Sequence, residues 1–434
     1  MTPRATRFRP FQYFARTGSL SGIVLLLATA VALAWANSPF ADTYFGLLER
    51  HFAVGPPSHP LDLTLLAWLN DGLMAVFFLL VGLEIKRELL VGELASPRQA
   101  ALPIAAALGG MLIPAALYRL VNPSGPAAAG WGIPMATDIA FALGILALLG
   151  PRVPLGLKVF LTALAIVDDL GAVVVIALFY SGAPHLVPMG LAAAIFLGLV
   201  LLNRSGVRQI SPYLLGGVLL WLAFHEAGIH PTIAGVLLAG TIPSRTRSNA
   251  LEFSTRAREL IDEFDRAETG DLLVITSKGQ QEALHGLERE SERVQAPLLR
   301  LEHGMQPLVQ YGIMPLFAFA NAGVPLGGGA GVDLITFATV GTVLGLVVGK
   351  PLGILLFSWA AVRLGRAELP SGTSWRLLLG AACLGGIGFT MSLFIAALAF
   401  DEGLLSSAKI GILVGSALAA LIGGGITMRE LRRP

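Results

Sequence analysis

Five ionisable residues lie deep inside long apolar stretches of this 434-residue sequence: Asp71, Asp138, Asp168, Asp169 and Lys350. A charge at the centre of a bilayer costs at least about 2.5 to 3.5 kcal/mol, so such residues usually face a cavity or a partner. Carboxylates in that setting bind protons or small hard cations, and an ammonium group compensates their charge. If the apolar stretches span a membrane, these residues mark a transport path.

The composition of the whole chain supports a membrane setting. Apolar residues make up 55% of the sequence and charged residues 13%, about half of the roughly 25% found in soluble domains. The 51 glycines and 26 prolines are typical of apolar helices that are often interrupted. The composition argues against a soluble enzyme and favours an all-α polytopic membrane protein.

Several other classes of protein lack support in the sequence. The single cysteine, Cys383, cannot form an intramolecular disulfide, and no spacing of Cys and His suggests a zinc site. The net charge of +2 comes without a basic patch that contains interleaved aromatic residues. We therefore expect no cofactor and no nucleic-acid partner.

Twelve stretches have the length and apolar character of a membrane-spanning helix, which needs about 20 residues. Their approximate limits are 20–37, 63–85, 101–121, 131–149, 155–180, 184–203, 211–227, 229–242, 308–323, 334–362, 376–399 and 407–427. The chain then divides into an N-terminal tail (1–19), spans one to eight (20–243), a charged loop (244–303), spans nine to twelve (304–427) and a C-terminal tail (428–434).

The basic residues predict how these spans are oriented. With alternating loops assigned to opposite sides, 26 of the 30 Lys and Arg residues fall on one side, which the positive-inside rule makes cytoplasmic. Both termini are then cytoplasmic. A cleavable signal peptide ending at Ala34-Trp35-Ala36 is the alternative interpretation of the first span. Its removal would leave eleven spans and place the C-terminus against the charge bias.

The segment 244–303 differs from the rest of the chain because it contains nine basic and twelve acidic residues. It has no transmembrane character, and Glu282–Arg293 within it reads as a short amphipathic helix. We interpret the segment as a solvated cytoplasmic insertion, with a regulatory lobe as the alternative.

Position along the spans brings some of the buried charges to one depth. Asp168 is 13 residues into the span 155–180 and Lys350 is 16 into the span 334–362. At about 1.5 Å per residue both reach the membrane midplane, so they can pair. Neighbouring helical residues point about 100° apart, so one of Asp168 and Asp169 can face Lys350 while the other faces a water-filled path. For Asp71, nearer the periplasmic side and beside Asn70, a structural and a functional role stay equally open.

Two spans contain interruptions next to polar residues, at Trp131–Asp138 and at Gly385–Ser392. Broken helices at membrane depth are tolerated where they are buried in protein or line a cavity, and matched breaks in two halves indicate a transporter site. Spans three to five and spans ten to twelve begin on opposite sides, which predicts an inverted repeat with the two broken helices crossing. Asp138 suits the positive helix N-termini at such a crossing, and Lys350 the negative C-termini.

Long strings of this sequence resemble the NhaA-type sodium/proton antiporter family. The resemblance spans nearly the whole chain except the insertion 244–296. The strings are Asn70–Glu84, Ala136–Gly144, Ala165–Gly171, Pro315–Gly323, Gly349–Gly353 and Gly386–Ser392. Inverted repeats with broken helices are the known architecture of this family.

The resemblance implies roles for particular residues. Asp168 and Asp169 would form the ion- and proton-binding pair, with Asp169 the more direct Na⁺ ligand and Asp168 the partner of Lys350. Thr137 and Asp138 would belong to the crossing of broken helices. The family's pH-responsive cluster corresponds to Glu84, Lys86, Arg87, Glu88, Glu302 and His303. Gln306 stands where some members have a further histidine, so the sequence does not fix the pH profile.

The resemblance also implies an activity and a location. We expect an electrogenic antiporter in the inner membrane, which is not an enzyme, exporting Na⁺ or Li⁺ for periplasmic H⁺ by alternating access. Two protons would enter per cation, and the exchange would regulate internal pH and sodium. The loop 37–60 corresponds to a periplasmic β-hairpin that pairs two protomers, so we expect a homodimer surrounded by membrane lipid.

Three alternatives remain at this point. A sodium-coupled solute symporter would need more polar side chains within the spans than the sequence offers. A cation channel fits the broken helices less well than alternating access does. An intramembrane aspartyl protease could use Asp138 and Asp168, but Lys350 would disturb the proton sharing that such a dyad requires.

Overall fold

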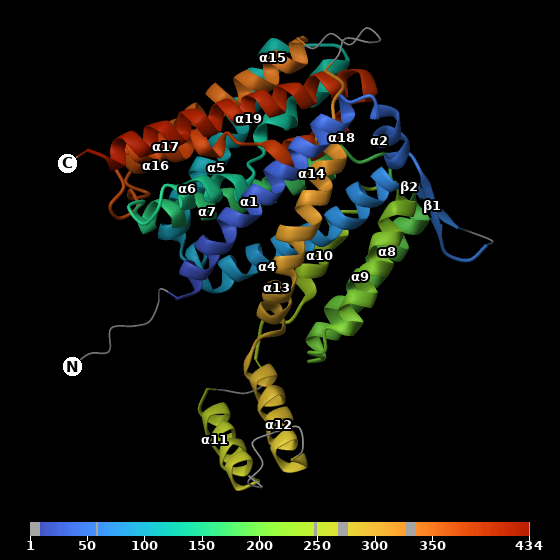
Figure 1. The fold of residues 1–434 in the computed structure, drawn as a ribbon, viewed down its shortest axis with the longest axis vertical. Helices are drawn as coiled ribbons and strands as arrows, with labels where there is room; N and C mark the ends of the chain where they lie inside the picture. Colours follow the sequence, from blue (N-terminus) through green and yellow to red (C-terminus); the bar gives the residue numbers. More distant parts are fainter. Residues whose placement is uncertain (1–8, 58–59, 247–249, 268–276, 327–334, 434) are drawn as a thin grey trace.

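The computed structural model describes residues 9–57, 60–246, 250–267, 277–326 and 335–433, most of which are helical. Figure 1 shows a body of long packed helices from which α11 and α12 project. Arg4 and Arg7, which contribute to the charge count of the N-terminal tail, lie outside the described residues.

The first half of the chain forms ten helices of the α type and one pair of strands within the described residues. In chain order they are α1 (Arg9–Ala36), α2 (Ala41–Leu48), β1 (His51–Val54), β2 (Leu61–Thr64), α3 (Leu65–Ala67), the π-helical stretch η1 (Trp68–Leu73), α4 (Met74–Val91), a 3₁₀ turn (Glu93–Ala95), α5 (Pro97–Val121), the 3₁₀ helix η3 (Pro126–Met135), α6 (Ile139–Leu148), α7 (Leu155–Phe179), α8 (Leu186–Arg204), α9 (Ser211–Ala227) and α10 (Ile233–Thr241).

The second half begins with the charged insertion and returns to apolar helices. In chain order it contains α11 (Ala250–Arg266), α12 (Lys278–Val294), α13 (Pro297–Leu308), the π-helical stretch η5 (Val309–Ile313), α14 (Met314–Ala322), α15 (Phe337–Leu344), the π-helical stretch η6 (Gly345–Gly349), α16 (Lys350–Arg363), α17 (Trp375–Gly385), α18 (Phe389–Ala399) and α19 (Glu402–Leu431).

Several of these helices are long and apolar enough to cross a membrane. Among the described residues six pass this test, and three further helix pairs pass it only when joined across a sharp bend. The six are Leu65–Val91, Pro97–Val121, Leu155–Phe179, Leu186–Arg204, Phe337–Arg363 and Gly403–Leu431. The chain is therefore a multi-pass membrane protein, as its composition predicts.

The count of twelve spans stays a prediction, although a helix lies at each expected position. Helices α9, α10 and α14 have only 17, 9 and 9 residues. Gly228 ends α9 in the left-handed region, at φ 74°, and Pro231 follows before α10 can begin. The local sequence thus explains why α9 and α10 are short.

The breaks expected near residues 131–138 and 385–392 are present. Pro126–Met135 and Ile139–Leu148 meet at 41°, and Trp375–Gly385 and Phe389–Ala399 meet at 43°. The third bent pair is different in kind, because α2 turns from α1 by 116°.

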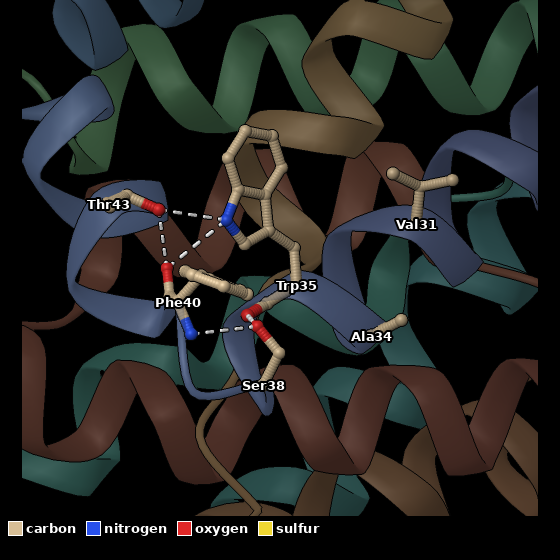
Figure 2. A pocket seen from close by; sticks show the side chains of 6 residues that line it. All are labelled: Val31, Ala34, Trp35, Ser38, Phe40 and Thr43. Carbon is tan, nitrogen blue, oxygen red and sulfur yellow. Dashed lines mark hydrogen bonds between the residues drawn. The ribbon is translucent and has the colours of Figure 1, made fainter.

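Trp35 stabilises the turn between α1 and α2. Its indole nitrogen donates to the Phe40 carbonyl at 3.2 Å and to Thr43 Oγ1 at 3.1 Å (Figure 2). A shallow groove beside it is lined mainly by apolar atoms of Val31, Ala34 and Phe40. A tryptophan with an apolar ring and one satisfied N–H suits the membrane–water interface.

The strands β1 and β2 pair antiparallel, with His51 opposite Thr64 and Val54 opposite Leu61. Strand β2 extends into the range expected for the second span. The helix begins only at Leu65, because the Thr64 hydroxyl caps it by accepting from the Ala67 N–H at 3.1 Å.

The insertion contains more helix than expected. The amphipathic helix at Glu282–Arg293 is confirmed as part of α12, whereas α11 was not expected. The two helices pack together, with Leu260 of α11 against the backbone at Gly286 of α12. At the other end of the insertion the Leu298 N–H donates to the Pro243 carbonyl at 3.1 Å, which closes the connection to the body.

Small residues bring α5 and α16 into close contact. A Cβ atom built on Gly109 would collide with the carbonyl of Gly353, and the reverse also holds. In lipid, helices associate through close packing because apolar burial offers little gain there. This contact fixes α16, and with it Lys350, against α5.

We predict that Gly109→Val destabilises the protein, because overpacking of this kind costs about 1–3 kcal/mol. The measurement is the apparent melting temperature of the purified protein in detergent. Gly198→Val on α8 is the matched control, since a Cβ there meets no atom within 4 Å. Equal melting temperatures for the two variants would contradict the close contact.

Candidate functional site

The breaks in the two interrupted helices meet in the interior. The Asp138 N–H donates to the Ile387 carbonyl at 2.6 Å, and Thr137 Oγ1 donates to the Gly385 carbonyl at 2.8 Å. Thr137 and Asp138 are 0% and 1% exposed. Backbone groups that lack a helical partner at one break are therefore hydrogen-bonded to residues of the other break. Broken helices within a membrane require such partners.

Asp138 lies between the N-termini of two half-helices. Its Oδ1 accepts from the Phe141 N–H of α6 at 3.2 Å. Its Oδ2 accepts from the Thr390 N–H at 3.1 Å and the Thr390 hydroxyl at 2.5 Å, at the start of α18. Both helix dipoles thus present positive partial charge to this carboxylate, which compensates its burial.

Lys350 supplies the opposite charge at the crossing. Its Nζ lies 2.7 Å from Asp168 Oδ2, and neither side chain is exposed. The same ammonium group donates to the carbonyl of Met135, at the C-terminal end of η3. The pairing that the depth of the two residues allowed is therefore present, and a negative helix end shares the cation.

Helix α16 begins at Lys350 directly after the π-helical stretch η6. Gly345 and Gly349 in this stretch lie against Pro134 and Pro114, where an added Cβ would be too close. Single π-turns inside helices occur frequently at functional sites. Here the stretch directly precedes Lys350.

Asp168 and Asp169 follow each other on α7 and are 1% and 2% exposed. The Oδ1 atom of each is buried and has no hydrogen-bond partner within the part of the chain that the structure describes. Buried polar atoms are normally paired. Unpaired carboxylate oxygens on two adjacent residues are suited to bind protons or a small hard cation such as Na⁺, which prefers oxygen ligands.

Asp71 has a different environment. It belongs to η1, its carbonyl accepts from the Trp221 indole at 3.0 Å, and its carboxylate lies 3.8 Å from His230 Nε2. Beside it, the side-chain amide of Asn321 donates to Asn70 at 2.7 Å. Asp71 thus contacts α9 and the turn before α10, while its neighbour Asn70 contacts α14. The sequence did not indicate His230 as the partner of Asp71.

Three residues of the expected pH-responsive cluster come together at the other end of α4. Arg87 pairs with Glu88 at 3.0 Å and with Glu302 of α13 at 3.2 Å. Burial raises the pKa of Glu302 above its usual value, and the charge of Arg87 partly opposes this shift. Glu84 lies one turn before Glu88. His303 points elsewhere, since its Nδ1 donates to the Leu299 carbonyl of its own helix at 2.7 Å.

Lys86 points away from these carboxylates. Its ammonium group donates to the carbonyls of Gly240 at 2.7 Å and Ile242 at 2.5 Å, and more weakly to that of Ala239 at 3.4 Å. Asn203 of α8 donates to the carbonyl of Thr241 at 2.6 Å. Together these side chains satisfy the free carbonyls at the C-terminus of α10.

Buried carboxylates at a crossing of two broken helices define a secondary transporter. A model of the family described as Na+/H+ antiporter 1 matches residues 12–426, so the chain belongs to this family of transporters. The resemblance seen in the sequence is thereby confirmed, and Na⁺/H⁺ antiport is the activity of the family.

Close relatives share nearly the full length of the chain. An Na(+)/H(+) antiporter NhaA of Oleidesulfovibrio alaskensis is 49% identical over 98% of this chain and 94% of its own length. Proteins of the same name from Syntrophobacter fumaroxidans and Acidithiobacillus ferrooxidans are each 51% identical. These two alignments cover 95% of this chain and 89% and 96% of the relatives.

We predict that Lys86→Met lowers the apparent melting temperature, because hydrogen bonds from a charged group contribute about 1.5–3 kcal/mol. Lys278→Met, at an exposed position of α12, is the control for loss of a positive charge. If Lys86 only caps α10, the pH profile of exchange should have the same midpoint in Lys86→Met as in wild type. A shifted midpoint without loss of stability would instead place Lys86 in pH sensing.

Proposed function

We propose that this chain exports Na⁺ or Li⁺ in exchange for protons, with Asp168 and Asp169 as the binding pair. The supporting observation is the geometry of α7. Two adjacent buried carboxylates each have an oxygen without a partner among the described residues, while Lys350 contacts Asp168 Oδ2. Asp169 is the more direct cation ligand because no ammonium group is hydrogen-bonded to it within the described residues.

Competition for one site couples the two ions. Adjacent carboxylates in a low-dielectric interior repel each other when both are charged. Protons or a bound Na⁺ relieve the same repulsion, so the site holds one or the other. Binding of a cation on the cytoplasmic side then expels protons, and protonation on the periplasmic side expels the cation.

Alternating access follows from the broken helices. Helices α5 to α7 and α15 to α19 contain the two breaks, the carboxylates and Lys350, and we propose that they form the inverted repeat. Asp138 and Lys350 neutralise the free helix ends, so the crossing stays intact while this bundle moves against the others. Exchange of two protons per Na⁺, as the family resemblance implies, makes each cycle electrogenic.

The remaining expectations concern the setting of the transporter. We propose cytoplasmic termini in the inner membrane and regulation of internal pH and sodium. The cluster of Glu84, Arg87, Glu88, Glu302 and His303 would sense pH, with Lys86 holding α10 beside it. The segment with β1 and β2 would pair two protomers within the lipid bilayer.

We predict that Asp169→Asn abolishes antiport, because the site loses the negative charge for which Na⁺ and H⁺ compete. The measurement is the dissipation of a preformed pH gradient by a sodium pulse in reconstituted vesicles. Asp42→Asn on α2 is the control, since Asp42 is exposed and outside the site. Normal exchange by the Asp169→Asn variant would overturn the assignment.

We predict a pH effect at Glu302, whose raised pKa means that the folded protein binds its proton more tightly than the unfolded chain does. This proton contributes stability at low pH that is lost as the pH rises through the raised pKa. The melting temperature of wild type relative to Glu302→Gln should therefore fall between about pH 4.3 and the raised value.

The same variant tests the sensor. Glu302→Gln cannot gain the charge that pairs with Arg87, so the midpoint of the pH profile of exchange should differ from that of wild type. Glu259→Gln, which removes an exposed ion pair with Arg256 at 2.6 Å, is the control. An unshifted profile would remove Glu302 from the cluster.

A further inference from the structure

The first half of the broken helix near residue 131 has an unusual form. The segment η3 is a 3₁₀ helix of 10 residues, Pro126–Met135, whereas runs longer than three or four residues are uncommon. Its last carbonyl, that of Met135, accepts from Lys350. The length of η3 therefore determines where one partner of the site's ammonium group lies.

A tyrosine hydroxyl is inserted into this 3₁₀ helix. Tyr180 donates to the Ala129 carbonyl at 2.8 Å and accepts from the Gly132 N–H at 3.1 Å. In a regular 3₁₀ helix these two backbone groups, three residues apart, would bond to each other. The hydroxyl thus bridges the two ends of one turn of η3.

The surroundings are shaped for this insertion. Gly132 leaves room for the hydroxyl, because an added Cβ would lie 2.7 Å from it. The Tyr180 ring stacks on Trp131, with centroids 6.3 Å apart and planes 27° from parallel. Tyr118 of α5 adds a second contact by donating to the Ala127 carbonyl at 2.9 Å.

Tyr180 also connects η3 to the helix that carries the ion site. It is the residue that ends α7, the helix that carries Asp168 and Asp169. One helix therefore supplies the carboxylates at its middle and the bridge to η3 at its end. Lys350 contacts both elements, through Asp168 and through Met135.

The choice of helix type has a large geometric effect. A 3₁₀ helix rises about 2.0 Å per residue and an α-helix about 1.5 Å, so conversion of ten residues would shorten the segment by about 5 Å. The Met135 carbonyl would then leave Lys350. Of its two partners, the ammonium group of Lys350 would then keep only Asp168. An entering cation would have to displace the ammonium group from Asp168.

We propose that Tyr180 is a positioning residue for the ion site: its hydroxyl keeps η3 extended so that the Met135 carbonyl shares Lys350 with Asp168. This inference rests on the proposed function of Asp168 and Asp169. It predicts that loss of the bridge weakens cation binding more than it slows the movement between states, because the crossing and its capping residues stay in place.

The experiment compares four proteins in vesicles: wild type, Tyr180→Phe, Gly132→Ala and the double variant. Sodium-pulse assays give the apparent KM for Na⁺ and the maximal rate. Tyr180→Phe should raise KM by about tenfold, equivalent to one lost hydrogen-bond bridge, with the maximal rate changed less than about twofold. Gly132→Ala, which retains the hydroxyl but displaces it, should have the same effect, and the double variant should add little.

Tyr213→Phe is the matched control, since the Tyr213 hydroxyl also donates to one backbone carbonyl, that of Val207 at 2.8 Å, away from the site. Its KM should equal that of wild type. An unchanged KM in both Tyr180→Phe and Gly132→Ala, with Asp169→Asn inactive, would overturn the role of Tyr180 and leave the proposed function intact. If Tyr180→Phe does not fold, Gly132→Ala decides alone. Exchange by Asp169→Asn would reject the proposed function itself.

Discussion

The ion pair between Asp168 and Lys350 is the constraint around which the rest of the structure is arranged. Removing two charges from water costs several kcal/mol per ion, and their attraction offsets this only when the remaining donors and acceptors are also satisfied. The Met135 carbonyl accepts a second hydrogen bond from the ammonium group. In the part of the chain that the structure describes, the Oδ1 atoms of Asp168 and Asp169 have no hydrogen-bond partner. On the proposed function, the transported ions bind there.

The crossing of broken helices follows from the same need. A carbonyl at membrane depth is free to accept from Lys350 only if its helix ends there, so η3 must stop at Met135. The N–H groups freed on the other side of each break then need acceptors, and Asp138 serves the starts of both α6 and α18. Thr137 completes the exchange by donating to the Gly385 carbonyl. The negative charge of Asp138 and the positive charge of Lys350 therefore explain why the two broken helices cross at their breaks.

The sequence predicted the parts of this site that depend on residue type. Charged residues at midplane depth are rare in apolar spans, and the two interruptions place Gly or Pro next to polar side chains, so Asp168, Lys350 and both breaks were visible. Contacts made by the backbone could not be predicted, because every residue has a carbonyl and nothing in the side chain of Met135 indicates that its carbonyl binds Lys350. Lys86 lies within a charged string, and only the fold shows that its ammonium group caps α10. The bridge by Tyr180 was hidden for the same reason, since its partners are main-chain atoms.

Sharing of one ammonium group between Asp168 and Met135 links ion binding to helix geometry. On the proposed mechanism a cation that enters the carboxylate pair competes with Lys350 for Asp168. Lys350 then loses its contact with Asp168 but keeps its hydrogen bond to the Met135 carbonyl of η3. Tyr180 in turn joins η3 to the end of α7. The carboxylates and η3 are thus attached at two points of the same helix. Displacement of the cationic side chain therefore changes the balance between two fixed partners, rather than releasing a charge into an apolar interior where it would have none.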